Sequence, residues 1–140
     1  MPLSPSPLLQ PVVALLIWSM VIWFWMYVTR IPAMQAMKLE LDPNLPPKDL
    51  TLPLPPRIRW KADNYNHLME QPTLFYAAVL VVALTDPGNG IALVAAWAYV
   101  LLRVAHSLVQ VLVNKIIVRF GLFFVASLAL MVLIAQAAMA

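Results

Sequence analysis

The sequence predicts an all-α integral membrane protein whose four transmembrane helices form an up-down bundle. Of its 140 residues, 63% are hydrophobic and only 11% are charged, a composition far from that of soluble domains. Four apolar stretches each approach the length that a helix needs to cross ~30 Å of hydrocarbon. The predicted spans cover residues 8–29, 66–85, 90–114 and 117–138 of a single domain of residues 1–140. The lipid bilayer is therefore the first partner that we expect.

The first span ends in a pattern that suits a membrane boundary. Three tryptophans precede Tyr27 and Arg30, and aromatic and basic side chains gather where helices reach the lipid headgroups. Residues 31–62 are rich in proline, which disfavours regular structure in the preceding residue. We predict an extended proline-rich cytoplasmic loop in this region rather than a folded domain.

The other three spans follow one another closely. From Pro72 to Thr85 the second apolar stretch is too short to span alone, so its helix should begin earlier and carry Glu70 and Asn66 into or near the membrane. The turn at residues 86–90 and the turn at residues 114–119 are both short. Spans two, three and four should therefore pack as sequential neighbours.

The basic residues predict the orientation in the membrane. All nine lie in or beside the first connection, inside the third span, or in the turn that follows it. The positive-inside rule then places the first connection and the 114–119 turn in the cytoplasm, and both termini on the other side. A basic band beside the membrane is what topology alone requires, so we do not expect nucleic acid as a partner. These residues are Arg30, Lys38, Lys48, Arg57, Arg59, Lys61, Arg103, Lys115 and Arg119.

A ladder of polar side chains runs along the third span. Its members fall within an arc of roughly 100° on one helix face, opposite an apolar face. Arginine near the bilayer centre costs about 2.5–3.5 kcal/mol on insertion scales, so the ladder should have a partner or a function. The ladder consists of Arg103, His106, Ser107, Gln110 and Asn114, and the apolar face of Val94, Leu101, Leu108 and Leu112.

A second polar cluster, which comprises Asp63, Asn66, His67, Glu70 and Thr73, lies at the start of the second span and shares an arc of roughly 120°. If this face meets the ladder, the two form a polar cleft that opens to the cytosol, with Arg103 deepest. Two simpler readings remain open. Arg103 and Glu70 can form an ion pair that fixes helix register, and His106, Gln110 and Asn114 can be structural residues between helices.

The sequence predicts no metal site. His67 and Glu70 resemble half of a Glu-x-x-His carboxylate site, but their order is reversed and no second copy exists. The chain has no cysteine, which excludes disulfides and thiolate ligands. Any thiol chemistry must therefore come from a substrate.

Two segments carry a resemblance to a known family. Residues 66–75 contain Asn, Glu and Pro in a short motif, and residues 97–107 contain the run Arg-Val-Ala-His. Arg119 follows Arg103 by sixteen residues. Together with the length, the four spans and the long first connection, these motifs resemble the MAPEG family, the membrane-associated proteins in eicosanoid and glutathione metabolism. The likeness covers essentially the whole chain and is that of a divergent bacterial-type member, which suggests a bacterial inner membrane.

The resemblance implies a homotrimer with glutathione sites at the subunit interfaces. It implies a transferase or peroxidase that uses glutathione as co-substrate and acts on a lipophilic small molecule. Arginines suit the carboxylates of glutathione, Glu70 its ammonium and Asn66 its peptide backbone. Arg119 is implied to be catalytic, because a fixed cation lowers the pKa of a thiol from about 8.5. The implied glutathione-binding residues are Asn66, Glu70, Arg103, His106 and Gln110.

Two of the chain's departures from the family pattern bear on its activity. Gln110 stands where family enzymes carry tyrosine, and Glu70 follows Asn66 by four residues instead of three. These departures motivate a second hypothesis, a non-catalytic accessory or structural subunit of a larger membrane complex that docks through the proline-rich loop. A third hypothesis is that the cleft binds another anion or a lipid headgroup.

Overall fold

The computed structural model describes residues 5–140, except for the side chains of Pro47 and Lys48. Within this part of the chain all regular structure is helical. Four helices are long and apolar enough to cross a membrane, because α3 and α4 follow one another directly and form one span. These observations confirm the predicted fold class. The elements are α1 (Leu9–Ala36), α2 (Pro47–Thr51), α3 (Pro56–Glu70), α4 (Pro72–Thr85), α5 (Gly90–Leu112) and α6 (Ile116–Met139).

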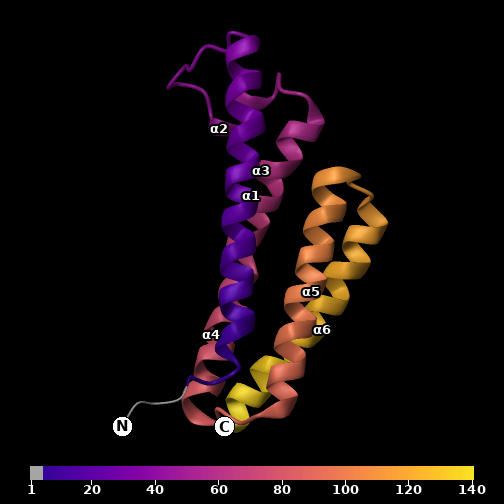
Figure 1. Ribbon diagram of the computed structural model, residues 1–140. Helices are drawn as coiled ribbons and strands as arrows, with labels where there is room; N and C mark the ends of the chain where they lie inside the picture. The colour runs from indigo at the N-terminus through magenta and orange to yellow at the C-terminus, as the bar shows by residue number, and fades with distance from the viewer. Residues whose placement is uncertain (1–4) are drawn as a thin grey trace.

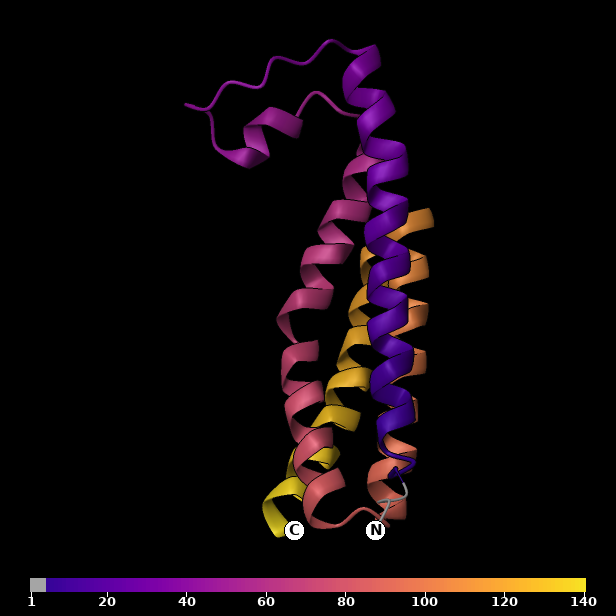
Figure 2. The same ribbon diagram turned by 60° about the vertical axis from the view of Figure 1, so that its left-hand side comes forward.

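The four spans run alternately up and down, so the bundle has two distinct ends (Figure 1). One, the terminal end, holds both ends of the described chain and the turn between α4 and α5. There the Ser6 hydroxyl donates to the Pro87 carbonyl over 2.9 Å, and the Asn89 amide donates to Gln136 Oε1 over 2.8 Å. The other, the connection end, holds residues 37–55 and the turn between α5 and α6. Figure 2 shows that α2 and its flanking segments project sideways from the end of α1.

The helices extend further into the first connection than the predicted spans. α1 continues through Pro32 to Ala36, and α3 already begins at Pro56. Pro56 occupies the first helical turn, where its missing N–H costs no hydrogen bond. The connection between α1 and α3 is accordingly shorter than the predicted loop of residues 31–62. It is not entirely irregular either, because it contains the five-residue helix α2.

The second span bends between α3 and α4. Pro72 has no N–H to donate to the carbonyl of Leu68, so the regular helical ladder is interrupted at this point. The backbone of Gln71 still has helical angles, and the chain therefore continues in the same general direction. As predicted, the helix starts well before Pro72 and includes Asn66 and Glu70.

α5 has well-defined signals at both ends. The Asn89 side chain caps its first turn by accepting from the amide of Ala92 over 2.9 Å. At the other end Asn114 adopts a positive φ of 54°, a conformation that asparagine tolerates better than most residues. Asn114 therefore lies beyond the end of the helix at Leu112, and the prediction that it belongs to the helical ladder is wrong.

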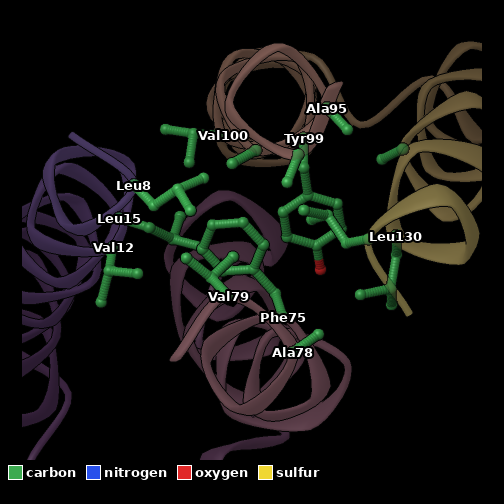
Figure 3. Close-up of a cluster of buried hydrophobic side chains, with 14 of the residues drawn as sticks. Leu8, Val12, Leu15, Phe75, Ala78, Val79, Ala95, Tyr99, Val100 and Leu130 are labelled. Atoms are coloured by element: carbon green, nitrogen blue, oxygen red, sulfur yellow. The ribbon is translucent and has the colours of Figure 1, made fainter. Parts of the chain in front are cut away.

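Buried apolar side chains from all four spans form one core, and Figure 3 shows part of it. Phe75 of α4 stacks on Tyr99 of α5 with ring centroids 4.6 Å apart, and Leu15 of α1 and Val79 of α4 are fully buried beside them. The core thus fixes the positions of the helices, and the polar side chains of α5 lie outside it, closer to the connection end.

Candidate functional site

Four of the five ladder residues lie on the inner face of α5. Arg103 and Ser107 are 0% exposed, and His106 and Gln110 are 2% and 3% exposed. The apolar residues predicted for the opposite face are exposed on the outside of the bundle, where a bilayer would surround them. The helical periodicity therefore places the polar face correctly, directed towards the other helices.

Arg103 is the largest fully buried side chain and is incompletely paired. Its Nη2 lies 3.2 Å from Nδ1 of His67, and its guanidinium carbon lies 5.9 Å from the ring centroid of Phe123. Among the described residues, neither its Nε nor its Nη1 has a hydrogen-bond partner, so the considered ion pair with Glu70 is not formed. Enclosed donors without partners cost free energy. Arg103 therefore retains the capacity to bind a further acceptor.

A small cavity lies between α3, α5 and the start of α6. It measures about 150 Å³, and we call it the imidazole cavity because His67 and His106 both line it. The centroid of the His67 ring is 5.1 Å from that of His106 and 5.4 Å from that of Phe123. Arg119 also lines the cavity, and its Nη1 donates to Asn114 Oδ1 over 2.7 Å. Two predicted site residues, His106 and Arg119, thus meet at one cavity, and Arg103 is linked to it through His67.

The polar cluster predicted for the second span does not face the ladder. Asp63, Asn66 and Glu70 are exposed, and we call their side the outer face of α3. Thr73 is exposed as well, so only His67 of the predicted cluster is directed inwards. The expected cleft between these two faces is therefore not formed within one copy of the chain. Asn66 and Glu70 lie on a different side of α3 from His106 and Arg119.

A different set of residues, Asn64, His67 and Gln71, contacts the other helices; we call it the inner face. The Asn64 amide donates to Gln110 Oε1 over 2.8 Å, and both side chains are buried. Gln71 accepts from the Tyr99 hydroxyl over 3.1 Å and donates to the Ser127 hydroxyl over 2.9 Å. The sequence analysis missed Asn64 and Gln71. The available signal was their spacing from His67, three and four residues, which defines one helix face.

A second cavity opens at the connection end. It measures about 330 Å³, and we call it the connection cavity. Arg30 from α1 and Arg59, Asp63 and Asn66 from α3 line it. Thr51 at the end of α2 and Leu52 and Leu54 after it complete the lining from the first connection. Nε of Arg59 is buried and has no partner among the described residues. Two guanidinium groups, a carboxylate and an amide therefore face one space, a donor and acceptor set that suits a zwitterionic ligand with carboxylates.

The described residues hold no group of three or more His, Asp or Glu side chains that could bind a metal ion. The polar groups that line the two cavities are mainly guanidinium, imidazole and amide groups. The arrangement can bind carboxylates and can stabilise negative charge next to an apolar wall.

The fold and these sites define a multi-pass membrane protein with a polar interior at one end of a four-helix bundle. The model of the MAPEG family matches residues 8–139, nearly the entire chain. The chain belongs to this family. Comparisons with curated proteins and with solved structures gave no match.

Proposed function

We propose that this protein is a glutathione-dependent transferase or peroxidase that acts on lipophilic electrophiles. One observation carries the proposal within a chain of the MAPEG family: Arg119, His106 and His67 meet at one cavity beside the buried Arg103. A guanidinium and further N–H donors at a partly apolar cavity are what a thiolate and its electrophile require.

Glutathione fits the groups of the connection cavity. Its two carboxylates match Arg30 and Arg59, whose Nε lacks a partner, and its ammonium matches Asp63. Asn66 can hydrogen-bond its peptide groups. The volume of about 330 Å³ lies at the lower end of the range for small-molecule pockets. Glu70, one helical turn from Asn66 on the outer face of α3, offers the glutathione ammonium a second carboxylate.

Arg119 is the proposed catalytic residue. Glutathione supplies the nucleophile, since its thiolate can displace a leaving group from an electrophile or reduce a hydroperoxide. A guanidinium beside the sulfur favours the thiolate over the thiol. The hydrogen bond from Arg119 to Asn114 holds this guanidinium at the imidazole cavity.

Two copies of the chain are needed to bring these groups together. Asn66 and Glu70 lie on the outer face of α3, whereas Arg119 lines a cavity enclosed by α3, α5 and α6 of the same copy. Glu70 is exposed halfway along the 30-residue span Pro56–Thr85, where a carboxylate facing lipid would be costly. A neighbouring copy that covers the outer face removes this cost. We therefore place the complete site at the interfaces of a homotrimer, with the outer face of one copy against the imidazole cavity of the next.

The connection end is the proposed cytoplasmic end. Eight of the nine basic residues lie in its loops or in the helix segments next to them, as the positive-inside rule requires. A water-soluble thiol then enters from the cytosol, and the lipophilic substrate enters from the bilayer. We assign the protein to a bacterial inner membrane with both termini outside the cytoplasm.

Calorimetry and turnover on the purified protein in detergent test the proposal. We expect heat of binding with millimolar glutathione and conjugation of an aryl halide or reduction of an organic hydroperoxide. Arg119→Ala should abolish turnover while glutathione still binds. Absence of both binding and turnover in the unmodified protein would exclude the function.

A non-catalytic accessory subunit is the second candidate, and one observation favours it. Gln110, which replaces the tyrosine of family enzymes, forms a buried hydrogen bond with Asn64 and so acts as a contact between helices. In this case the polar interior is structural and the first connection docks a partner in a larger membrane complex. Full glutathione activity of the purified chain without any other subunit would rule this candidate out.

A further inference from the structure

His67 is held in one hydrogen-bonding state by Arg103. Nη2 of Arg103 lies 3.2 Å from Nδ1 of His67, and a guanidinium can only donate. Nδ1 must therefore be the acceptor, and the ring hydrogen of the neutral imidazole is on Nε2. A fully buried cation thus fixes the tautomer of a neighbouring histidine.

The ring of His67 is also fixed in orientation. It meets Phe123 edge-on at an interplanar angle of 87° and packs against His106, and all three residues line the imidazole cavity. Because Nδ1 is occupied by Arg103, any hydrogen bond from His67 to a molecule in this cavity comes from Nε2–H. No other described residue occupies Nε2.

The donors of the cavity select the kind of group that it can hold. His67 offers one N–H and Arg119 offers those of its guanidinium, while no carboxylate lines the cavity. A volume of about 150 Å³ lies well below the ~300–1,000 Å³ of pockets that hold whole small molecules, so only the end of a molecule enters. The best occupant is a small group whose oxygen gains negative charge during the reaction.

The outer wall of the cavity is apolar and suits a substrate with an apolar tail. Ile116 and Phe120 line the cavity, and their side chains are 69% and 67% exposed on the membrane-spanning helix α6. These exposed fractions are those of a single copy. In the proposed trimer a molecule dissolved in the bilayer reaches this wall at the edge of the subunit interface and places its polar end inside. Conjugated enals and enones with an alkyl tail combine both features.

We propose that His67 donates from Nε2 to the carbonyl oxygen of a lipophilic α,β-unsaturated carbonyl substrate. This role rests on the proposed glutathione transferase function. The thiolate forms a bond to the β-carbon, the C=C π electrons shift to give an enolate, and the negative charge on its oxygen is stabilised by His67. The α-carbon then takes a proton from water, which leaves the saturated thioether. His67 acts as a hydrogen-bond donor throughout and neither gains nor loses a proton.

Two substitutions at this position separate the two ring nitrogens. His67→Asn retains an acceptor near the position of Nδ1 and removes the donor, whereas His67→Gln retains a donor near the position of Nε2 and removes the acceptor. We expect His67→Asn to lower kcat/KM for trans-2-nonenal by about 100-fold or more, as removal of one oxyanion donor does. His67→Gln should recover most of this loss.

Benzyl chloride serves as the matched control substrate, because no oxygen gains charge when its chloride is displaced. His67→Asn should lower its kcat/KM far less than that of trans-2-nonenal, so the ratio of kcat/KM for trans-2-nonenal to kcat/KM for benzyl chloride should fall by about 30-fold or more. Equal losses with both substrates would overturn the role of His67 and leave the transferase function intact. No conjugation of either substrate by the unmodified protein would overturn the transferase function and this role with it.

Nitrogen-15 NMR of histidine-labelled protein tests the tautomer without any turnover. The signals of His67 are assigned by their loss in His67→Asn. We expect a protonated Nε2 and an unprotonated Nδ1, and a mixture of tautomers in Arg103→Met. A proton on Nδ1 in the unmodified protein would contradict the proposal.

Discussion

The inner and outer faces of α3 carry similar polar side chains in opposite environments. Asn64 and Gln71 on the inner face are paired with groups on α5 and α6 of the same copy. Asn66 and Glu70 on the outer face are exposed, although α3 and α4 together have the length and composition of a membrane span. Polar side chains in a membrane helix face protein or water rather than lipid. The polar side chains of the inner face therefore have their partners within one copy. Those of the outer face need a partner from outside it, such as a ligand or a neighbouring copy.

The two faces of α3 therefore have different roles that can be measured separately. Substitutions on the inner face should change the stability of the bundle, because they break hydrogen bonds within it. Substitutions on the outer face should change ligand binding, because the polar side chains of this face have no hydrogen-bond partners among the described residues of one copy and remain available to a ligand. Arg103 and Arg119, which connect the inner face to the imidazole cavity, should show the largest effects.

The largest expected effect is that of Arg119→Ala. Loss of the cation beside the thiol should lower kcat for glutathione conjugation by about 100- to 1,000-fold, in the range for removal of one electrostatic group. The affinity for glutathione, measured by calorimetry, should change far less. Arg119→Lys retains a charge and should keep part of the activity. Unchanged kcat in Arg119→Ala would remove this residue from the catalytic site.

Arg103→Met should stabilise the bundle even though it removes a fully buried side chain. Two of its nitrogens lack partners, and replacing buried charge by an apolar side chain of similar volume can stabilise by about 1–4 kcal/mol. Thermal unfolding without glutathione measures the change, and Arg103→Lys, which keeps the charge, is the control. A loss of about 3–5 kcal/mol would instead indicate that Arg103 is paired in the assembled protein.

Glu70→Gln on the outer face should weaken glutathione binding with little change in stability. Loss of a charge-assisted hydrogen bond of about 1.5–3 kcal/mol corresponds to roughly a 10- to 100-fold weaker Kd. The unfolding free energy should change by less than about 0.5 kcal/mol, as for surface positions. Calorimetry and thermal unfolding of the same samples measure both quantities. An unchanged Kd together with a lower unfolding temperature would reverse the roles of the two faces.

The smallest expected effect concerns the hydrogen bond between Asn64 and Gln110. A double-mutant cycle with Asn64→Ala and Gln110→Ala should give a coupling energy of about 0.6 kcal/mol and no more than about 1.7 kcal/mol, the range for such bonds in membranes. Thermal unfolding of the four proteins measures it. No coupling would mean that the two side chains stabilise the bundle independently of their hydrogen bond.

Sequence periodicity predicts the spans and the face of α5 for physical reasons. Lipid requires about 20 apolar residues per helix, and a 3.6-residue repeat separates Leu101 and Leu108 from Arg103 and Ser107. On α3 the same repeat resolves two polar faces but does not determine which of them is buried. That choice depends on the partners Gln110 and Ser127, which lie far away in the sequence.

The remaining differences have local or long-range causes. Asn114 leaves the helix because its positive φ ends α5, a feature that hydrophobic periodicity does not include. The connection cavity requires Thr51, Leu52 and Leu54 to lie beside Arg30 and α3. Such a contact between a proline-rich loop and two helices has no repeating pattern in the sequence that would reveal it.

Mixed trimers test most directly whether the site joins the outer face of one copy to the imidazole cavity of the next. Chains with Glu70→Gln and chains with Arg119→Ala are co-expressed in equal amounts and purified together through two different tags. Turnover is measured at a glutathione concentration below the raised Kd of Glu70→Gln, where each variant alone has little activity. Random assembly leaves one intact interface in every mixed trimer, and purification through both tags removes the uniform trimers. The preparation should therefore regain about a third of the sites of the unmodified protein. No recovery above the two single variants would contradict a site shared between copies.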